Sequence, residues 1–369
     1  MKNPEFISVT DTKKIESLVS SGVTIRDEIR SQTDELCEIR NPELRDTPEE
    51  FFQKKDEFFK NYQSESVFCY LPWRNMCIRI LSKEFYQELH TSRNKNLITK
   101  DEQKNFREAR VAIAGMSVGS NIARICAMQG GPASINVADA DSYSISNFNR
   151  VLGGIQYLGV KKVDSVIEQL YEVDPFLSLQ GFGEGITTEN LSSFMTINGK
   201  PVDILVEEID SIDIKFGLRE YAETHRIPVV SIVDNEDGVL VDIERYDEDY
   251  TYAQFEERLK GVVIDRTQKP KSADIARIVT NFIGAKDVET RMLESASVVG
   301  KELYSWPQLG NAAAMAGSVG SFVVRQIANG KLKKSGRIKI SLSQIFGTTE
   351  ADEVERRKSV MTFYNYEKK

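Results

Sequence analysis

The stretch Val111-Ala112-Ile113-Ala114-Gly115-Met116-Ser117-Val118-Gly119-Ser120 decides the fold. Its first four residues are apolar and predict a short buried strand, and the segment after it has apolar side chains at helical spacing. A glycine-rich turn between a strand and a helix directs backbone N–H groups and the positive helix end toward a phosphate. Ser117 stands where a second glycine is usual, so Gly115 and Gly119 fit an ordinary tight turn as well as a phosphate loop.

The segments that follow alternate between strand and helix patterns. A second strand over residues 135–139 completes one strand, helix and strand in about thirty residues, the length of a right-handed βαβ unit. Further strands are predicted at 203–206 and 228–233, with helices over 163–171 and 214–222. This alternation predicts an α/β fold, a doubly wound Rossmann-like domain whose mostly parallel sheet has helices on both faces.

Three regions are predicted along the 369-residue chain. Residues 1–90 form a mainly helical region with a hairpin over 66–81, residues 91–246 form the α/β core, and residues 247–369 complete that domain. Thr47-Pro48-Glu49-Glu50 predicts a helix start, with a Thr N-cap, Pro at the first helical position and Glu at the capping-box position. Elements predicted further on are a strand over 239–246, a helix over 311–329 and a strand over 337–342.

Composition excludes several classes of protein. The net charge of −8 argues against a general binder of nucleic acids or anionic membranes, because an acidic surface repels both. No apolar run approaches the roughly 20 residues that cross a bilayer. The N-terminus lacks the apolar core of a signal peptide, so the sequence predicts a cytoplasmic protein. The four cysteines form no C-x-x-C pair, and we expect neither zinc nor a disulfide framework.

An acidic residue, Asp139, closes the second strand. At this position a carboxylate accepts hydrogen bonds from ribose hydroxyls of NAD or ATP, although it can also simply cap the next turn. The segment continues as Asp139-Ala140-Asp141, then Ser146-Asn147-Phe148-Asn149-Arg150, then Gly159-Val160-Lys161-Lys162.

In this part the sequence resembles the ThiF/MoeB/ubiquitin-activating superfamily, whose members show D-x-D, S-N-x-x-R and G-x-x-K at almost this spacing after a glycine loop. The resemblance implies Mg-ATP-dependent adenylation of a carboxylate, with release of pyrophosphate. It assigns these residues to ATP: Gly115, Ser117, Gly119, Asp139, Asp141, Asn147, Arg150 and Lys162. Arg150 and Lys162 also become catalytic, because attack at the α-phosphorus builds charge that cations must stabilise.

The resemblance extends to the strand end Val206-Glu207-Glu208-Ile209-Asp210. Asp210 matches a catalytic family Asp that helps to hold magnesium, and one carboxylate with phosphates suits that ion. Alternatively, Asp210 caps the helix that follows. Lys215 matches a basic position in relatives, but a solvated helix charge fits it equally.

Family members are dimers in which an N-terminal Arg reaches the neighbour's ATP site. The resemblance therefore implies a homodimer and gives Arg93 this catalytic role, with Lys95 as the second choice. A solvated charge run is the alternative. Trp306-Pro307-Gln308 together with Ser335-Gly336-Arg337 is similar to free-standing bacterial ThiF-like proteins.

The sequence also departs from the family. Many relatives bind zinc through two C-x-x-C pairs, which are missing here, and every cysteine lies at or before Cys126, which fits a helix core. We therefore expect no enzyme thioester, and the adenylate would pass to an external nucleophile or to an amine or amide of the substrate. His225 is interpreted as a helix-end or packing residue. Residues 1–90 either recognise substrate, with Val67–Tyr70 pairing to an added peptide strand, or form a dimerisation layer.

The leading hypothesis is thus adenylation of a carboxylate on a peptide, a protein or a small molecule. An NAD-dependent oxidoreductase is one alternative, although it has no use for Arg150 and Lys162 over the phosphates. A catalytically silent nucleotide-binding scaffold is another. It would not need Asp139, Arg150, Lys162 and Asp210 together.

Overall fold

The computed structural model describes residues 3–258 and 283–367, so residues 259–282 of the predicted C-terminal extension lie outside the described residues. The chain divides into two compact units. The N-terminal unit contains Met1–Arg107, Cys126–Ala133 and Ile167–Ser178, and the α/β unit contains Glu108–Ile125, Ser134–Val166 and Leu179–Lys369. No helix within the described ranges is both long and apolar enough to cross a membrane. The three regions expected from the sequence stay a prediction.

The N-terminal unit contains a four-stranded sheet in the order β1-β3-β4-β2. Its strands are β1 (Glu5–Ser8), β2 (Thr24–Asp27), β3 (Ser66–Leu71) and β4 (Met76–Leu81). The antiparallel pair β3–β4 confirms the predicted hairpin, and Asn75 turns the chain in the left-handed region with φ 48°. Because β3 also pairs with β1, it is an inner strand. The prediction that a peptide adds to Val67–Tyr70 is therefore wrong.

Helices of the N-terminal unit are α1 (Thr12–Ser20), α2 (Ile29–Arg40), α3 (Pro48–Tyr62), α4 (Lys83–His90) and α5 (Lys100–Glu108), the last ending one residue into the α/β unit. Helix α3 confirms the predicted start at Pro48, but the capping box is wrong. The Thr47 hydroxyl donates to the carbonyl of Leu44 at 3.2 Å and does not cap α3. The description of this region as helical was also incomplete, because only the hairpin of its sheet was predicted.

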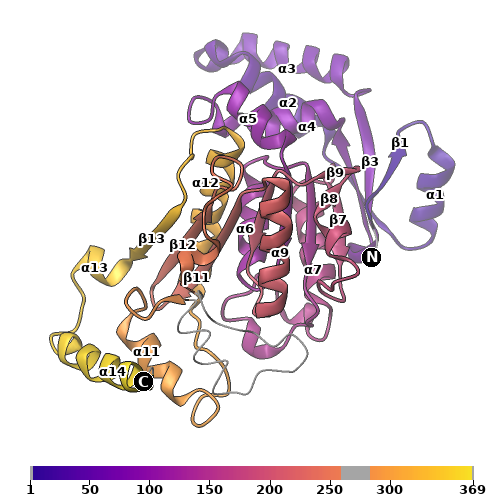
Figure 1. Cartoon of the computed structure of the whole chain (residues 1–369). Helices are drawn as coiled ribbons and strands as arrows, with labels where there is room; N and C mark the ends of the chain where they lie inside the picture. The colour runs from indigo at the N-terminus through magenta and orange to yellow at the C-terminus, as the bar shows by residue number, and fades with distance from the viewer. Residues whose placement is uncertain (1–2, 259–282, 368–369) are drawn as a thin grey trace. The chain divides into compact units, whose positions relative to one another are not determined.

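The α/β unit is built on a seven-stranded, mostly parallel sheet in the order β13-β12-β11-β10-β5-β6-β7. Figure 1 labels β13, β12, β11 and β7 of this sheet. The strands are β5 (Arg110–Ala114), β6 (Ser134–Ala138), β7 (Ser178–Phe182), β10 (Ile204–Glu207), β11 (Val229–Asn235), β12 (Gly238–Glu244) and β13 (Gly336–Ser341). Strands β11, β10, β5 and β6 pair in parallel, whereas β12 pairs antiparallel with β11 and β13. The predicted doubly wound α/β fold is confirmed.

Side chains of β5 alternate between the two faces of this sheet, as expected for a pleated strand. Ala112 and Ala114 pack in one apolar core with Leu218 of α9 (Ile212–His225), which crosses the sheet in Figure 1. On the other face, Ile113 contacts the start of α6 (Val118–Met128). Helix α12 (Gly310–Ala328) packs closely on α6, because Gly317 and Gly320 have no side chains.

The remaining elements are α7 (Lys162–Val173), α8 (Leu191–Phe194), β8 (Thr196–Ile197), β9 (Lys200–Pro201), α11 (Thr290–Val298), α13 (Leu342–Phe346) and α14 (Glu353–Glu367). The chain runs from β5 to β6 on one side and returns through β10 to β11 on the other. The strand order therefore reverses between β5 and β10, and such a switch point opens a crevice at the carboxyl ends of the strands.

Candidate active site

The glycine turn lies at this switch point. Gly115 has a φ of +89°, and its N–H donates to the carbonyl of Ala138 at 2.7 Å. A Cβ at Gly115 would stand 2.4 Å from the carbonyl oxygen of Glu208, the residue after β10. Both the backbone conformation and this close approach require glycine. The turn therefore joins the ends of the two strands that flank the crevice.

The rest of the turn leads directly into α6. A Cβ at Gly119 would lie 2.9 Å from a methyl group of Ile113, so glycine lets the helix start close to β5. The Ser117 hydroxyl oxygen is buried and has no hydrogen-bond partner in the part of the chain that the structure describes. A buried hydroxyl without a partner costs about 1–3 kcal/mol, so Ser117 fits a position that a ligand or a water completes.

Asp139 closes β6 beside the turn. Its Oδ2 accepts from the N–H of Met116 at 2.7 Å, and its Oδ1 accepts from the N–H of Asp141 at 2.8 Å. Asp139 thus caps local backbone, as one interpretation of the sequence had it. A carboxylate offers about four acceptor positions, so this does not prevent it from accepting ribose hydroxyls as well.

Lys162, the first residue of α7, is held between two carboxylates. Its Nζ lies 2.9 Å from Oδ2 of Asp141 and 3.7 Å from Oδ2 of Asp139. Only 7% of its side chain is exposed, whereas 72% of the Asp141 side chain is exposed. The ammonium group is therefore fixed next to the glycine turn, with one partner that solvent or a ligand can replace.

Asn147 and Arg150 lie on the loop after β6. The Oδ1 of Asn147 accepts from the N–H of Ser144 at 3.0 Å, which stabilises a short 3-10 helix. Arg150 Nη1 donates to the carbonyl of Ser146 and to Oδ1 of Asn149, at 3.1 and 2.9 Å. Its Nε is buried without a partner among the described residues. Burial lowers the pKa of Arg150, although Asp234 and Asp210 oppose this shift.

Asp210 follows β10 at the same edge of the sheet. It keeps contact with solvent, yet the protein around it removes part of its hydration and thereby raises the pKa of Asp210. Lys215 and Lys162 oppose this rise, whereas Glu207 and Asp139 add to it. Lys162 lies beside Asp139, and Asp210 is within electrostatic range of Asp139, Lys162 and Arg150.

Two alternative interpretations of this region were wrong. Ser211, not Asp210, is the N-cap residue of α9, and the Asp210 carboxylate makes no hydrogen bond or ion pair with any described residue. Lys215 is not a solvated helix charge. Its Nζ is buried and lies 2.8 and 3.0 Å from the two carboxylate oxygens of Glu207.

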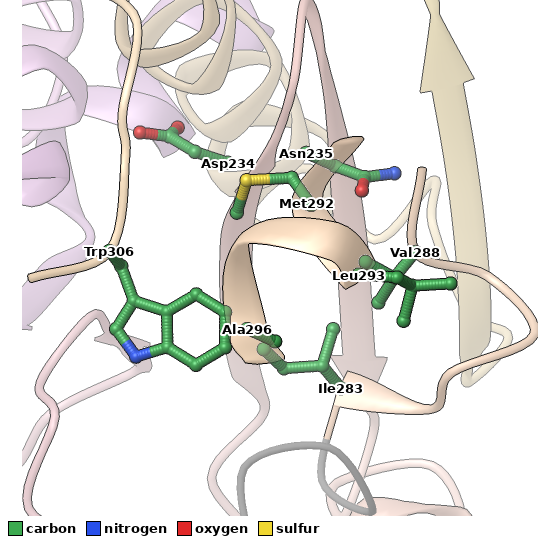
Figure 2. A pocket seen from close by; sticks show the side chains of 8 residues that line it. All are labelled: Asp234, Asn235, Ile283, Val288, Met292, Leu293, Ala296 and Trp306. Carbon is green, nitrogen blue, oxygen red and sulfur yellow. The ribbon is translucent and has the colours of Figure 1, made fainter. Parts of the chain in front are cut away.

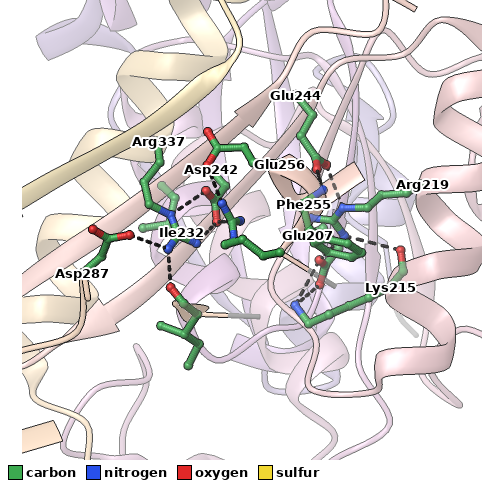
Figure 3. A network of polar contacts seen from close by, with 12 residues as sticks. Glu207, Lys215, Arg219, Ile232, Asp242, Glu244, Phe255, Glu256, Asp287 and Arg337 are labelled. Carbon is green, nitrogen blue, oxygen red and sulfur yellow. Dashed lines mark hydrogen bonds and ion pairs between the residues drawn. The ribbon is translucent and has the colours of Figure 1, made fainter. Parts of the chain in front are cut away.

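Lys215 belongs to a buried network of charges, shown in Figure 3. Arg219 donates from Nη1 to Glu207 at 2.8 Å and from Nε to Glu244 at 2.7 Å, and its guanidinium lies 3.9 Å from the centre of the Phe255 ring. The second oxygen of Glu244 accepts from the N–H of Phe255 at 2.6 Å. Burial alone would raise the pKa of Glu207, but Lys215 and Arg219 outweigh it and lower that pKa.

The sequence did not single out Asp234, near the end of β11. Its Oδ2 accepts from Gln308 Nε2 at 3.3 Å, whereas Oδ1 is buried with no partner in the described ranges. Burial raises the pKa of Asp234 to about 6, and Arg150 and Gln308 oppose this shift. The strand-end position, which Asp139 and Asp210 share, was the one signal that could have marked it.

A small cavity lies beside β11, between Trp306 and α11 (Figure 2). Its volume of about 20 Å³ is room for about one water molecule. The side chains that line it with Asp234 are mostly apolar: Ile283, Val288, Met292, Leu293, Ala296 and Trp306. The Asp234 carboxylate points away from them, so the cavity is part of the packing of this unit.

The model of the ThiF family matches residues 91–328, more than half of the chain. This chain belongs to the ThiF family. It is 31% identical over 274 residues to the uncharacterized protein MT1398 of Mycobacterium tuberculosis. This match covers 74% of this chain and 38% of that protein. It is 32% identical over 122 residues to tRNA threonylcarbamoyladenosine dehydratase 2 of Saccharomyces cerevisiae, covering 33% of this chain and 27% of that protein.

The ThiF-family chain thus spans less than two fifths of the length of these two curated relatives. Among solved structures, it is similar to the E. coli tRNA N6-threonylcarbamoyladenosine dehydratase in complex with AMP. That comparison has a TM-score of 0.47 and 17% identity, and it covers 68% of this chain and 98% of the other.

The ThiF-family site has a donor set that fits magnesium. The described residues contain no group of three or more His, Cys, Asp or Glu side chains able to hold a metal ion by themselves. Magnesium usually keeps several waters and binds one or two carboxylates together with phosphates. Asp210, with both oxygens unengaged by described residues and access to solvent, suits that mode of binding.

Arg93 and Lys95 are exposed residues of the N-terminal unit, and Arg93 lies on the 3-10 helix Ser92–Asn94. Their predicted action on a neighbouring subunit stays a prediction. His225 ends α9, where Nδ1 lies 2.8 Å from the carbonyl of Tyr221 and the two rings stack. This confirms its interpretation as a helix-end and packing residue.

All four cysteines of the ThiF-family chain are buried. Burial raises the pKa of Cys69 and of Cys126 to about 12, and that of Cys77 to about 11, and it also raises the pKa of Cys37. A thiolate is the nucleophilic form of cysteine, so these thiols are poor nucleophiles at neutral pH. The expectation that Cys126 belongs to a helix core is confirmed.

Proposed function

We propose that this ThiF-family chain uses Mg-ATP to adenylate a carboxylate, releases pyrophosphate, and passes the acyl group on without an enzyme thioester. One observation carries the proposal: Lys162 Nζ lies 3.7 Å from Oδ2 of Asp139 at the switch point of a parallel sheet, and Asp210 acts electrostatically on both residues and on Arg150. Nucleotidyl transfer depends mainly on positioning and on stabilising charge, and this arrangement offers both.

Each residue has a distinct part in the proposed reaction. The N–H groups and the Ser117 hydroxyl of the glycine turn bind phosphates, and Asp139 accepts the ribose hydroxyls. A substrate carboxylate oxygen attacks the α-phosphorus, the new O–P bond forms, and the bond to pyrophosphate breaks. Arg150 and Lys162 stabilise the charge that develops on the triphosphate.

The remaining assignments follow the same resemblance. Gly119, Asp141 and Asn147 line the nucleotide site. When the nucleotide binds, Asp141 would release Lys162 and contact a group of the ligand instead. Asp210 would hold magnesium, which neutralises phosphate charge when bound.

The acid substrate is carried by a peptide, a protein or a small molecule, and we propose a homodimer as the active form. Arg93 would reach the neighbour's site, with Lys95 as the second choice. Their exposure leaves both side chains accessible to a partner. In the N-terminal unit, β1 and β2 are the edge strands to which a peptide could add.

The exchange of labelled pyrophosphate into ATP tests this function. We expect exchange that requires magnesium and a carboxylic acid, measured over a panel of acids and peptides. Asp210→Ala should reduce it at least about 100-fold, as removal of a charge-stabilising group does. Asp213→Ala, three residues away on α9, serves as the control and should retain exchange.

Other outcomes would favour the alternatives. Binding of NAD without exchange would indicate an oxidoreductase, and binding of ATP without exchange for any acid would indicate a scaffold. For Arg93, the test uses mixed dimers. A subunit carrying Arg93→Ala paired with one carrying Asp210→Ala should recover part of the activity if Arg93 acts across the interface, and none if it acts within its own subunit.

A further inference from the structure

Asp234 lies at the edge of the sheet where the proposed reaction takes place. It is the sixth residue of β11, which runs parallel to β10. The carboxyl ends of parallel strands meet at one edge, so Asp234 shares that edge with Gly115, Asp139 and Asp210. Yet no step of ATP binding uses it.

The Asp234 carboxylate is half satisfied. Its residue is 6% exposed, Oδ2 accepts from Gln308, and Oδ1 is buried without a partner among the described residues. Arg150 acts on it electrostatically, but within the described ranges no ion pair joins the two, and Arg150 Nε is also buried and unpartnered. An acceptor and a donor are thus both left open.

Neighbouring contacts hold these two side chains in place. Arg150 Nη1 donates to Oδ1 of Asn149, whose Nδ2 donates to the carbonyl of Gln308 at 2.7 Å. Gln308 in turn donates to Asp234. These contacts link Arg150, Asn149, Gln308 and Asp234 in a series, and the bond from Gln308 to Oδ2 restrains the rotation of the Asp234 carboxylate, whose Oδ1 stays open.

The chemistry of the open atom defines what can complete it. An ionised carboxylate only accepts hydrogen bonds, so its partner must donate one. A buried carboxylate oxygen without a donor is costly, because its lost hydration is not replaced. The acid that is activated at this edge can bring such a donor in an N–H group of its own.

We propose that Asp234 determines substrate specificity: its free Oδ1 accepts a hydrogen bond from an N–H group close to the carboxylate that is adenylated. The inference rests on the proposed adenylation. It restricts the substrates to acids with a neighbouring amide or amine, and it disfavours acids that present an apolar or anionic group there.

Peptides and their matched esters test this inference. Pyrophosphate exchange is measured with a library of tripeptides and with depsipeptides in which the last amide N–H is replaced by an ester oxygen. A hydrogen bond to a charged group is worth about 1.5–3 kcal/mol, so the active tripeptide should exceed its ester about 10- to 100-fold in kcat/KM. Asp234→Ala should abolish this preference while the KM for ATP stays unchanged.

The control is Asp237→Ala, because Asp237 is exposed on the same hairpin and pairs with Asn311 instead. It should keep the preference of the native protein. Equal use of amide and ester by the native protein, or a preference that survives in Asp234→Ala, would overturn the role of Asp234 while adenylation stands. Exchange only with acids that lack an N–H would do the same. Absence of exchange with every acid would refute the proposed function itself, and this inference with it.

Discussion

Two groups of charged side chains lie on neighbouring strands of the same sheet, and they differ in how completely their polar atoms are paired. Around Glu207, both carboxylate oxygens meet buried cations, and Arg219 bridges to Glu244. Around Asp234, a carboxylate oxygen, the Arg150 Nε and the Ser117 hydroxyl are buried with no partner among the described residues. The first group is paired within the protein, whereas the second has polar atoms that a ligand could pair with.

The difference matters because burial has opposite consequences in the two groups. The paired charges of the Glu207 network compensate one another in the low-dielectric interior. Removing one member therefore leaves the others buried without a compensating charge. The unpaired atoms already lack hydrogen-bond partners in the free protein, so they lower its stability there. Removing one of them should therefore not decrease the free energy of unfolding. Stability and function are therefore expected to separate between these neighbours, and four variants test this.

The largest effect is expected for Glu207→Ala. Loss of this carboxylate leaves Lys215 and Arg219 buried with too few negative partners, which should lower the free energy of unfolding by about 3–5 kcal/mol. Urea denaturation measures this. Glu184→Ala is the control, because that side chain is 89% exposed and should change stability by less than about 0.5 kcal/mol. A loss of similar size in both variants would remove the distinction between the groups.

Lys162→Ala should reduce pyrophosphate exchange at least about 100-fold, because the cation next to the phosphates is lost. The adjacent Lys161 donates to the carbonyl of Ala140 and is partly exposed, so Lys161→Ala is a matched control that should retain most activity. Exchange that persists in Lys162→Ala, or that fails equally in both variants, would contradict the assigned role.

Asp234→Asn should stabilise the free protein at neutral pH. The folded pKa of about 6 lies above the unfolded value near 3.9, so the native state binds more protons between these values and stability falls as pH rises through them. Removing the charge should return about 3 kcal/mol at pH 7.5 and less than about 1 kcal/mol at pH 4. The charged groups that act with Asp234 are Arg150 and Glu208. Denaturation at both pH values measures the difference, and an equal effect at both would show that Asp234 is not its source.

The smallest effect is expected for Ser117→Ala. The hydroxyl has no partner in the described protein, so its removal should not lower the melting temperature. If the hydroxyl binds a phosphate, the affinity for a non-hydrolysable ATP analogue should fall about 3- to 10-fold, the worth of one hydrogen bond. Calorimetric titration measures it. Ser120→Ala, whose hydroxyl donates within the helix start, is the comparison and should not weaken binding.

Local sequence was sufficient to predict the α/β fold. Apolar runs before Gly115, Asp139 and Asp210 indicated parallel strands. Such strands are buried on both faces, so all of their side chains are apolar instead of alternating with polar ones. Strands β1 and β2 carried no such signal. They are four residues long and mostly exposed, and distant pairing with β3 and β4 forms them. Sequence patterns do not contain that information.

The order of the motif residues predicts Asp139, Arg150, Lys162 and Asp210 as members of one site, and the fold places Lys162 beside Asp139. Their roles in a reaction stay a prediction. The sequence allowed Lys215 to be interpreted as a solvent-exposed charge, because its partner Glu207 lies on a different element, eight positions earlier. Asp234 was missed because Asp234-Asn235-Glu236-Asp237-Gly238 has the composition of a polar turn, whereas the fold buries its first residue.

The burial of all four thiols has a practical consequence for studying this protein. The folded chain should resist alkylating reagents, so one cysteine introduced at the surface becomes a unique attachment point and no native cysteine has to be removed. Placed at the exposed Leu97, such a cysteine would carry a fluorophore or spin label into the segment that we propose approaches a second subunit. The separation of two labels would then report assembly directly, and labelling that fails to saturate at one group per chain would show that the native thiols open to solvent.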